Sequence, residues 1–303
     1  MKPSSHGLPA HAAAGIAHSV HLPDLEAAVE LTGAHLRTVN EGWRYPWHDH
    51  ACFELNLVTA GEQRTALASG ELHQRPGDLL LFAPFDAHSS RNAGSGALSY
   101  FCLHFDLDDP LLRQMLCRSG TRLFVAGSPI ARALTPKLQR LIELAQATPP
   151  PGTDAEAQGL QQRLAGLSAW FDVLSTLTAC LQDELASHPP VPAARLRLAT
   201  QLSRWIEQQV QDPGCEQSLQ ALVARLGYSA SHIHHLFREV FGMAPQQYRT
   251  RLKHRRARLL LQDATLTVRA VAEALGYDDM AHFSRQFKRW EGVSPLQFRQ
   301  RAA

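Results

Sequence analysis

Residues 267–299 read TVRAVAEALGYDDMAHFSRQFKRWEGVSPLQFR, and a related stretch precedes them in the same chain. Residues 218–249 read SLQALVARLGYSASHIHHLFREVFGMAPQQYR, which aligns with the later stretch at an offset of 49 residues before the turn and 50 residues after it. A repeat of this kind indicates that one supersecondary unit is built twice. The fold of this region therefore follows from what one copy can form.

Each copy has the pattern of two helices joined by a tight turn. The apolar residues that open the first copy have the i, i+3, i+4, i+7 spacing of a buried helical face; they are Leu219, Leu222, Val223 and Leu226. The second helices repeat this pattern with Ile233, Leu236, Phe237 and Val240 in one copy and Phe283, Phe287 and Trp290 in the other. Two helix-turn-helix units are predicted, at 218–241 and 267–291.

Capping residues mark the ends of these helices. Ser218 and Thr267 are placed to cap the first helices, and Ser229 and Asp278 to cap the second helices; Gly227 and Gly276 stand between them. Glycine ends a helix at low cost because it readily adopts the left-handed conformation. The turn of each unit is therefore predicted at its glycine.

The outward faces of the second helices carry short or polar side chains that can reach base edges in a major groove. These candidate DNA contacts are Ser231, His234, His235 and Arg238 in the first unit, and Ala281, His282 and Arg285 in the second. Arg256 is the candidate for a phosphate contact, within a basic cluster that also holds Arg249, Arg251, Lys253, Arg255 and Arg258. Any one of these charges could simply be solvated, but the whole set beside two such units favours DNA.

The segment between the two copies is predicted to form one helix from Pro245 to Gln262. Proline suits a first helical turn, and a helix of this length spans about 27 Å. That length would hold the two units near the repeat of B-DNA, which is about 34 Å.

Charge divides the chain into two parts. Residues 195–303 carry 17 Lys and Arg against 9 Asp and Glu, whereas the remaining residues are acidic overall. A basic end suits a polyanionic partner. The chain shows no signal-peptide pattern and no obvious membrane-length apolar run, and its five scattered cysteines suggest reduced thiols. A cytoplasmic protein without membrane partners is expected.

The quoted repeat resembles the AraC/XylS family of transcription regulators, across roughly residues 195–301. The resemblance rests on GMAPQQYR at 242–249 and on AVAEALGYDDMAHFSRQFKRWEGVSPLQFR at 270–299. It places the recognition positions on Ser231, His234 and His235, and on Ala281, His282 and Arg285; His235 stands where many members have arginine. It implies double-stranded DNA as a partner, with RNA polymerase as a further candidate.

The N-terminal part reads as an all-β unit. Short stretches at 53–59, 78–83 and 99–106 are bounded by Gly, Pro and Asn, and residues 130–147 look helical. Proline-rich breaks follow at 148–152 and 188–192. We therefore expect a barrel domain at 1–150, a helical region at 151–187, a linker at 188–194 and a DNA-binding domain at 195–303.

Two segments of the N-terminal part resemble the cupin motifs. Gly42, His48, His50, Glu54 and Gly61 have the spacing of the first motif. Gly77 to His88 followed by Asn92 is similar to the second motif, although Pro84 is displaced by one place and Asp86 replaces the usual glycine region. The resemblance implies a cupin-like β-barrel.

His48, His50 and Glu54 share one parity on an extended strand, so their side chains can point the same way. With His88 they form a set suited to a divalent transition metal, which is the candidate cofactor. The alternative is that these residues only line an effector pocket, as sensor domains of this family often lack the metal. Trp43 and Trp47 could then stack on a sugar or related metabolite.

A long helix is expected between the proline breaks. Its apolar residues have 4-3-4-3 spacing, typical of a coiled-coil seam: Leu160, Leu164, Leu167, Phe171, Leu174, Thr178, Leu181 and Leu185. The seam could bind a second copy, which would make the protein a homodimer, or it could pack on the barrel of its own chain.

These patterns together predict an α+β multidomain protein, with a cupin-like barrel, dimerisation helices and an all-α domain holding two helix-turn-helix units. The predicted function is sequence-specific DNA binding controlled by a small-molecule effector, without enzymatic activity. The alternative is a metal-dependent cupin enzyme fused to a DNA-binding domain. The sequence offers no nucleophile–base pair and no nucleotide-binding loop, which favours the regulator.

Overall fold

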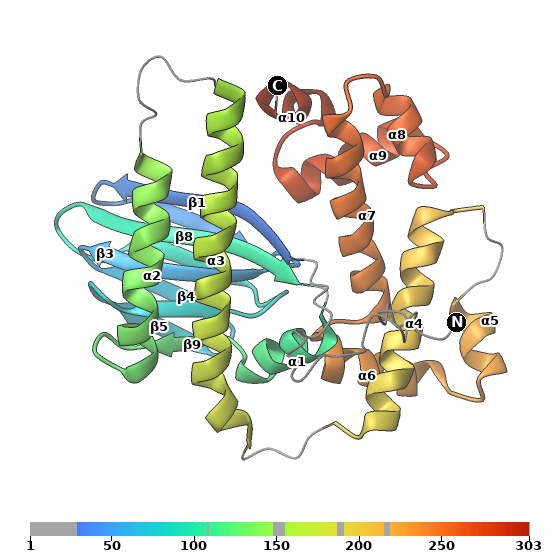
Figure 1. Ribbon diagram of the computed structural model, residues 1–303, viewed down its shortest axis with the longest axis horizontal. Coiled ribbons are helices and arrows are strands. Elements are labelled where there is room, and N and C mark those ends of the chain that lie inside the picture. The colour runs from blue at the N-terminus through green and yellow to red at the C-terminus, as the bar shows by residue number, and fades with distance from the viewer. Residues whose placement is uncertain (1–28, 108, 148–154, 187–190, 215–218, 303) are drawn as a thin grey trace, which may run out of the picture.

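The computed structural model describes residues 29–107, 109–147, 155–186, 191–214 and 219–302. They form a sheet-rich domain, here the barrel domain, and a helical domain that lies beside it (Figure 1). The α+β multidomain class is confirmed. Ser218 and linker residues 188–190 lie outside the described residues, as does the side chain of Leu185.

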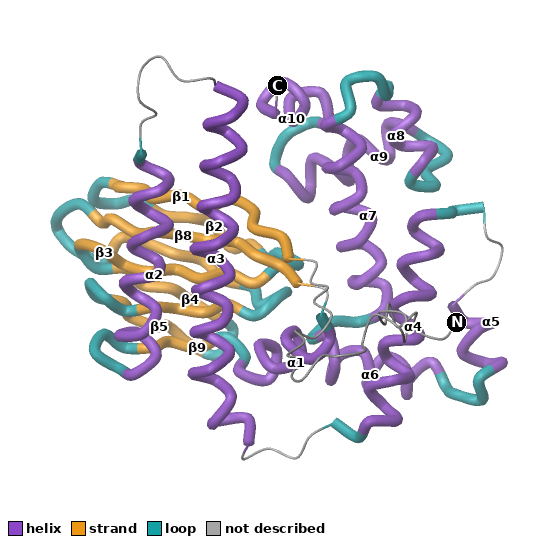
Figure 2. Tube along the Cα trace, viewed as in Figure 1, coloured by secondary structure: helices purple, strands orange, loops and turns teal. Residues whose placement is uncertain are grey.

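Two antiparallel sheets make the barrel domain, shown in orange in Figure 2. The first has the order β1 (Val29–Val39), β8 (Leu98–Leu107), β3 (Phe53–Ala60), β6 (Leu79–Phe82) and β9 (Arg122–Phe124). The second has the order β2 (Arg44–His48), β7 (His88–Asn92), β4 (Gln63–Leu67) and β5 (Gly70–Gln74). The strands expected at 53–59, 78–83 and 99–106 are confirmed as β3, β6 and β8.

The alternation of side chains along β3 separates a dry face from a polar one. Phe53, Leu55 and Leu57 belong to a hydrophobic core shared with helices. Glu54 and Asn56 are also buried, but they face the second sheet, where Gln63 Nε2 of β4 donates to Asn56 Oδ1 at 3.3 Å. The space between the sheets therefore holds polar side chains that could orient a small molecule.

Three helices complete the barrel domain: α1 (Pro110–Ser119), α2 (Pro129–Gln146) and α3 (Ala155–Ala186). In Figure 1, α2 and α3 lie across one face of the sheets. Leu134 and Leu138 of α2 and Trp170 of α3 pack in the same core as Phe53. The helix expected at 130–147 is confirmed.

The predicted seam of α3 divides into two parts. Leu174 and Leu181 are buried in the core of their own domain. The N-terminal part of the seam is exposed and forms an apolar stripe of Leu160, Leu164, Leu167 and Phe171. The expectation of one continuous seam was wrong because the buried face of α3 runs through Trp170, Val173, Leu177 and Leu181, and the predicted row meets this face only in its later part.

One membrane-length apolar segment exists, contrary to the expectation from sequence. By length and composition alone, Gly159–Gln182 of α3 could cross a bilayer. Trp170, Val173 and Leu177 of this segment are fully buried in the core of the barrel domain. Packing within the domain therefore accounts for the apolar residues of its C-terminal part, whereas the apolar residues of its N-terminal part are exposed.

The helical domain contains α4 (Ala193–Gln211), α5 (Leu219–Arg225), α6 (Ala230–Phe241), α7 (Pro245–Gln262), α8 (Val268–Ala274), α9 (Met280–Glu291) and α10 (Pro295–Ala302). It has two separate cores, one around Phe237 and one around Phe287. The connecting helix α7 has the predicted bounds and joins the cores (Figure 1).

Both helix-turn-helix units form as predicted, with one difference in a cap. Ser229 caps α6 and Thr267 caps α8 through side-chain oxygens, and Gly227 and Gly276 have φ of 74° and 69°. The cap of α9 is Asp279 instead of Asp278; its carboxylate accepts from the amides of Ala281 and His282. The turn of the second unit is thus one residue longer, as the shift in repeat offset requires.

Buried ion pairs join the two domains. The Asp106 carboxylate of β8 pairs with Arg113 of α1 and with Arg251 of α7. Burial would raise the pKa of Asp106, but the two guanidinium groups lower it below its usual value. Arg113 Nε also donates to the carbonyl of Phe241 at 2.9 Å, so α1 is fastened to the end of α6.

Candidate functional site

Strand register brings four of the site residues together. Across β2 and β7, His48 lies opposite His88, and across β3 and β8, Glu54 lies opposite His104. His50 stands in the connection between β2 and β3. The shared parity expected for His48, His50 and Glu54 on one strand was therefore wrong, although the three side chains do meet.

Three of these imidazoles are oriented by backbone carbonyls. The Nδ1 atom of His48 lies 3.0 Å from the carbonyl oxygen of Pro46, that of His50 lies 2.9 Å from Cys52, and that of His88 lies 2.8 Å from Asp86; these are three hydrogen bonds of one kind. A carbonyl only accepts, so each Nδ1 carries the proton. In the neutral rings, each Nε2 then presents a lone pair, as in histidines that bind a metal.

The Glu54 carboxylate lies at the centre of the cluster. Its Oε2 is 3.0 Å from His50 Nε2, 3.3 Å from His104 Nε2 and 3.7 Å from His88 Nε2. Burial would raise the pKa of Glu54, but its hydrogen bonds with these histidines hold it well below the usual value. Burial would lower the pKa of His50, and its bonds to Cys52 and Glu54 outweigh this and raise it to about 11.

An unprotonated Nε2 cannot hydrogen-bond to a carboxylate, so a short contact between Nε2 and Oε2 needs a positive charge on the ring or between the two atoms. A proton on His50 can supply that charge, and a metal ion would do so for all the rings at once. The ligand-capable atoms of His48, His50 and His88 lie within 4.8 Å of one another, and so do those of His50, Glu54 and His104. The donor set of imidazole and carboxylate fits a divalent transition metal.

The cluster opens into a pocket of about 450 Å³, here the barrel pocket. Trp43 lines it as expected and packs beside Tyr100, with ring centroids 5.5 Å apart. Trp47 is not in the pocket: it is 57% exposed and lines a separate groove with Arg64 and Arg91. Because side chains alternate along β2, the inward position of His48 places Trp47 on the outside.

Sequence reasoning missed several pocket residues. His104 and Cys102 of β8 and His35 and Arg37 of β1 all line the barrel pocket. The strand containing His104 was predicted, and its alternation could have marked His104 as inward facing. No cupin motif includes this position, and its pairing with Glu54 depends on a register set far along the chain.

The proposed recognition residues of the first unit lie on the outer face of α6. Ser231, His234, His235 and Arg238 are exposed, whereas Ile233, Leu236 and Phe237 between them are buried. The helical period of 3.6 residues produces this division. The exposed residues therefore share one surface that faces away from the core of their unit.

The second unit repeats this arrangement on α9. Ala281, His282 and Arg285 are exposed, and Phe283 and Phe287 are fully buried. The Arg285 side chain is 71% exposed and lies 3.8 Å from Asp279, so it can leave that partner readily. Both units thus present polar side chains of a length that reaches base edges.

The basic residues of α7 do not all face solvent. Arg251 is buried against Asp106, Arg255 pairs with Glu30 of β1 at 2.8 Å, and Arg258 lies 3.5 Å from Glu291. Arg256, expected at a phosphate, is half-buried and its guanidinium donates to the Val210 carbonyl of α4. Much of the cluster is therefore engaged within the protein because α7 lies between both domains.

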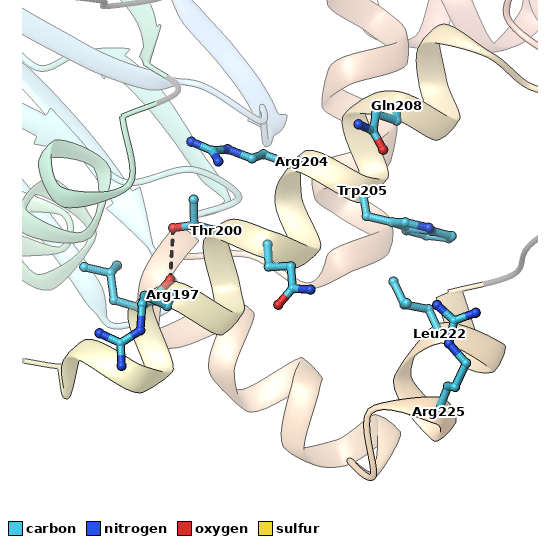
Figure 3. A pocket seen from close by; sticks show the side chains of 9 residues that line it. Arg197, Thr200, Arg204, Trp205, Gln208, Leu222 and Arg225 are labelled. Atoms are coloured by element: carbon cyan, nitrogen blue, oxygen red, sulfur yellow. Dashed lines mark hydrogen bonds between the residues drawn. The ribbon is translucent and has the colours of Figure 1, made fainter. Parts of the chain in front are cut away.

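A groove of about 610 Å³ lies between α4 and α5 of the first unit (Figure 3). Trp205 and Leu222 approach each other across it, and Arg197, Arg204 and Arg225 surround it. None of the residues that line this groove is acidic. The first unit therefore carries positive charge beyond its recognition face, which suits a polyanion.

Family comparisons match both domains. An AraC-like ligand-binding domain matches residues 34–168, and a helix-turn-helix domain matches residues 222–301. The chain belongs to the AraC/XylS family of transcription regulators. This AraC-family protein therefore has an effector-binding barrel domain and a DNA-binding helical domain, and it is a DNA-binding transcription regulator.

Two curated relatives span most of the chain. The arabinose operon regulatory protein of Salmonella typhimurium is 26% identical over 246 residues, covering 81% of this chain and 82% of that protein. An uncharacterised helix-turn-helix regulator of Bacillus subtilis, YisR, is 26% identical over 233 residues, 74% of this chain and 77% of that protein. Both names agree with the family assignment.

A solved structure of ToxT from Vibrio cholerae shows the same overall fold. It has a TM-score of 0.51 at 8% sequence identity and covers 90% of this chain and 98% of that one. The two chains therefore share the arrangement of a sheet-rich domain followed by a helical domain.

Proposed function

We propose that this regulator reads DNA through the outer faces of α6 and α9. Ser231, His234, His235 and Arg238 contact one major-groove segment, and Ala281, His282 and Arg285 contact the next. The observation that supports this is that both exposed faces consist of polar or short side chains on helices whose opposite faces are buried. Arg256 reaches a phosphate after its bond to Val210 opens.

The barrel pocket binds a divalent transition metal together with the effector. His48, His50, Glu54 and His88 hold the ion, and Trp43 contacts the organic effector, for which a sugar or related metabolite is the candidate class. The support is the convergence of oriented imidazole nitrogens on the Glu54 carboxylate. Bound there, the metal supplies positive charge that can orient an anionic or hydroxyl group of the effector.

The protein works in the cytoplasm as a homodimer. Its apolar stripe of Leu160, Leu164, Leu167 and Phe171 supports pairing with a second copy, since such a row of exposed apolar residues at helical spacing favours a partner helix. RNA polymerase is the partner through which a DNA-bound regulator changes transcription. The chain has no catalytic role, in keeping with relatives that are regulators.

Mapping the chromosomal sites that the full-length protein occupies tests this proposal. Wild type should occupy a small set of promoter regions, and a variant carrying Ser231→Ala, His235→Ala and Arg285→Ala should lose those sites while remaining folded. Retention of the same sites by the variant would mean that other surfaces read the DNA.

A further inference from the structure

The helical domain contributes one residue to the lining of the barrel pocket. Glu291, the last residue of α9, lines the pocket together with His104 and Arg37 of the barrel domain. Its Oε1 accepts from His254 Nε2 at 2.5 Å and lies 3.5 Å from Arg258 Nε, so α7 fixes its position. Among the lining residues, the carboxylates are Glu54 and Glu291, and they come from different domains.

The carboxylate of Glu291 interacts electrostatically with a cation in the pocket. A divalent cation held by Glu54 and neutral imidazoles leaves net positive charge, to which Arg37 adds. The carboxylate of Glu291 comes near this charge when the helical domain is docked; because it also pairs with His254 and Arg258 of α7, it offsets the charge only in part. An ion in the pocket therefore favours the docked arrangement.

Phe85 forms a second connection between the metal-binding loop and the helical domain. Among the described residues other than glycine, Phe85 alone has a positive φ, at 62°. Its amide donates to the His50 carbonyl at 2.8 Å, and its side chain packs against the core of the first helix-turn-helix unit. The next residue, Asp86, supplies the carbonyl that orients His88.

A bulky residue in the left-handed conformation is strained and persists only where its surroundings hold it. Here the barrel loop holds the backbone of Phe85 and the helical domain holds its side chain. A shift of His50 or His88 would therefore move Phe85 and change its packing against the first helix-turn-helix unit. Glu291 belongs to α9 and connects the pocket to the second unit.

We propose that cation binding in the barrel pocket and docking of the helical domain on the barrel domain are one coupled equilibrium, in which Glu291 and Phe85 carry the coupling. This inference rests on the proposed metal site. Coupling between two sites is reciprocal: the cation strengthens docking by the same factor by which docking strengthens cation binding. A change that loosens docking therefore weakens cation binding by at most that factor.

Isothermal titration calorimetry of the full-length protein with Zn²⁺ tests the role of Glu291. We expect Glu291→Gln to weaken zinc binding about tenfold, the lower end of the effect usual for groups that support a metal site. The control is Glu273→Gln on α8, which removes an exposed carboxylate paired with Arg269 and should leave zinc binding unchanged.

A pair of glycines tests docking itself. Gly242 and Gly227 have φ of 70° and 74°, so alanine introduces similar backbone strain at either position. A Cβ at Gly242 would lie 2.3 Å from Cys117 Sγ and 3.2 Å from Cys117 Cβ of α1, whereas a Cβ at Gly227 would meet nothing within 4 Å. Only Gly242→Ala should loosen the contact of α1 with the helical domain.

Hydrogen exchange of the α1 amides measures docking in these variants. We expect Gly242→Ala to speed this exchange and to weaken zinc binding severalfold, and Gly227→Ala to do neither. Suppose that wild type binds zinc, and that Glu291→Gln and an undocked Gly242→Ala both bind it as tightly as wild type. The proposed coupling would then be wrong, and the proposed metal site would stand. If wild type binds no zinc, the metal site is wrong and the coupling falls with it.

Discussion

At the scale of single residues, hydrogen bonds to backbone carbonyls set the orientation of the histidine rings in the barrel pocket. Three backbone carbonyls hold a proton on Nδ1 of His48, His50 and His88, and the Nε2 atoms of His50 and His88 point toward Glu54. This arrangement is stable only with a positive charge at its centre. A proton and a metal ion are therefore competitors for the same space.

His88→Ala should abolish stoichiometric zinc binding, because it removes a buried nitrogen of the proposed ligand set. His104→Ala should weaken binding by about tenfold to a hundredfold, since His104 Nε2 lies 3.3 Å from Glu54 Oε2, a proposed ligand of the ion. Elemental analysis and calorimetry of the purified variants measure both effects. Zinc bound as tightly by His88→Ala as by wild type would leave these residues as the lining of an effector pocket.

Asp106 is the residue on which the contact between domains depends. Asp106→Asn leaves Arg113 and Arg251 buried without their counter-charge, and such a loss costs about 3–5 kcal/mol. We expect a lower midpoint of thermal unfolding and faster proteolysis between the domains. The matched control is Asp172→Asn, which breaks an exposed pair with Lys137 and should change the midpoint little. Equal midpoints for the two variants would contradict a structural role for Asp106.

The sequence could predict part of this site and not the rest. His48, His50, Glu54 and His88 were found because the cupin spacing is local in sequence. His104 and Glu291 could not be found in this way, because their places depend on strand register and on docking of a distant domain. Trp47 was wrongly expected in the pocket because it directly precedes His48. Neighbouring residues of a strand point to opposite faces, so Trp47 points away from the pocket.

At the scale of elements, the two proposed recognition helices, α6 and α9, have the same length and different exposed side chains. The repeat aligns His235 of α6 with Arg285 of α9, so the second unit carries the longer donor that can bind a guanine in two places. We therefore expect α9 to dominate discrimination between bases at its segment.

Arg285→Ala should relax base preference in the segment read by α9, at a cost of about 1–3 kcal/mol for the matched base pair. Quantitative binding to a set of single-base variants of a bound sequence measures this. The control is Arg269→Ala, an exposed arginine on α8 that is paired with Glu273. The assignment fails if Arg285→Ala weakens binding equally for every base.

The apolar stripe of α3 is the element proposed for dimerisation. Leu164→Glu with Leu167→Glu places charges on this exposed stripe, so we expect a folded monomer in analytical ultracentrifugation. Leu174 is unsuitable for this test because it is buried in the domain core. Gln161→Glu, beside the stripe, should leave a dimer. A dimer that survives the double substitution would place the interface elsewhere.

Elements were predicted best where the pattern is local. The helix from Pro245 to Gln262 was predicted to the residue because Pro245 starts it and a turn ends it. The heptad seam of α3 was predicted as continuous, but the sheets bury its later part and leave its earlier part free. Periodicity shows that a face is apolar and does not show what covers it.

At the scale of the whole molecule, an acidic barrel domain lies against the basic connecting helix of the DNA-binding domain. Glu30 and Asp106 pair with Arg255 and Arg251, which the sequence alone would assign to phosphates. Composition predicted the charge of each half correctly. It could not show that part of this charge is used between the halves, since that depends on tertiary contacts.

The most direct test of the account is selection of sequences bound by the full-length protein from a random duplex library. Tandem units joined by α7 predict an enriched sequence with two conserved segments, whose centres lie about 10 base pairs apart on one face of the duplex. The segment read by α9 should become degenerate with Arg285→Ala. Enrichment of a single segment, or no enrichment by a folded protein, would contradict a regulator that reads DNA with both units.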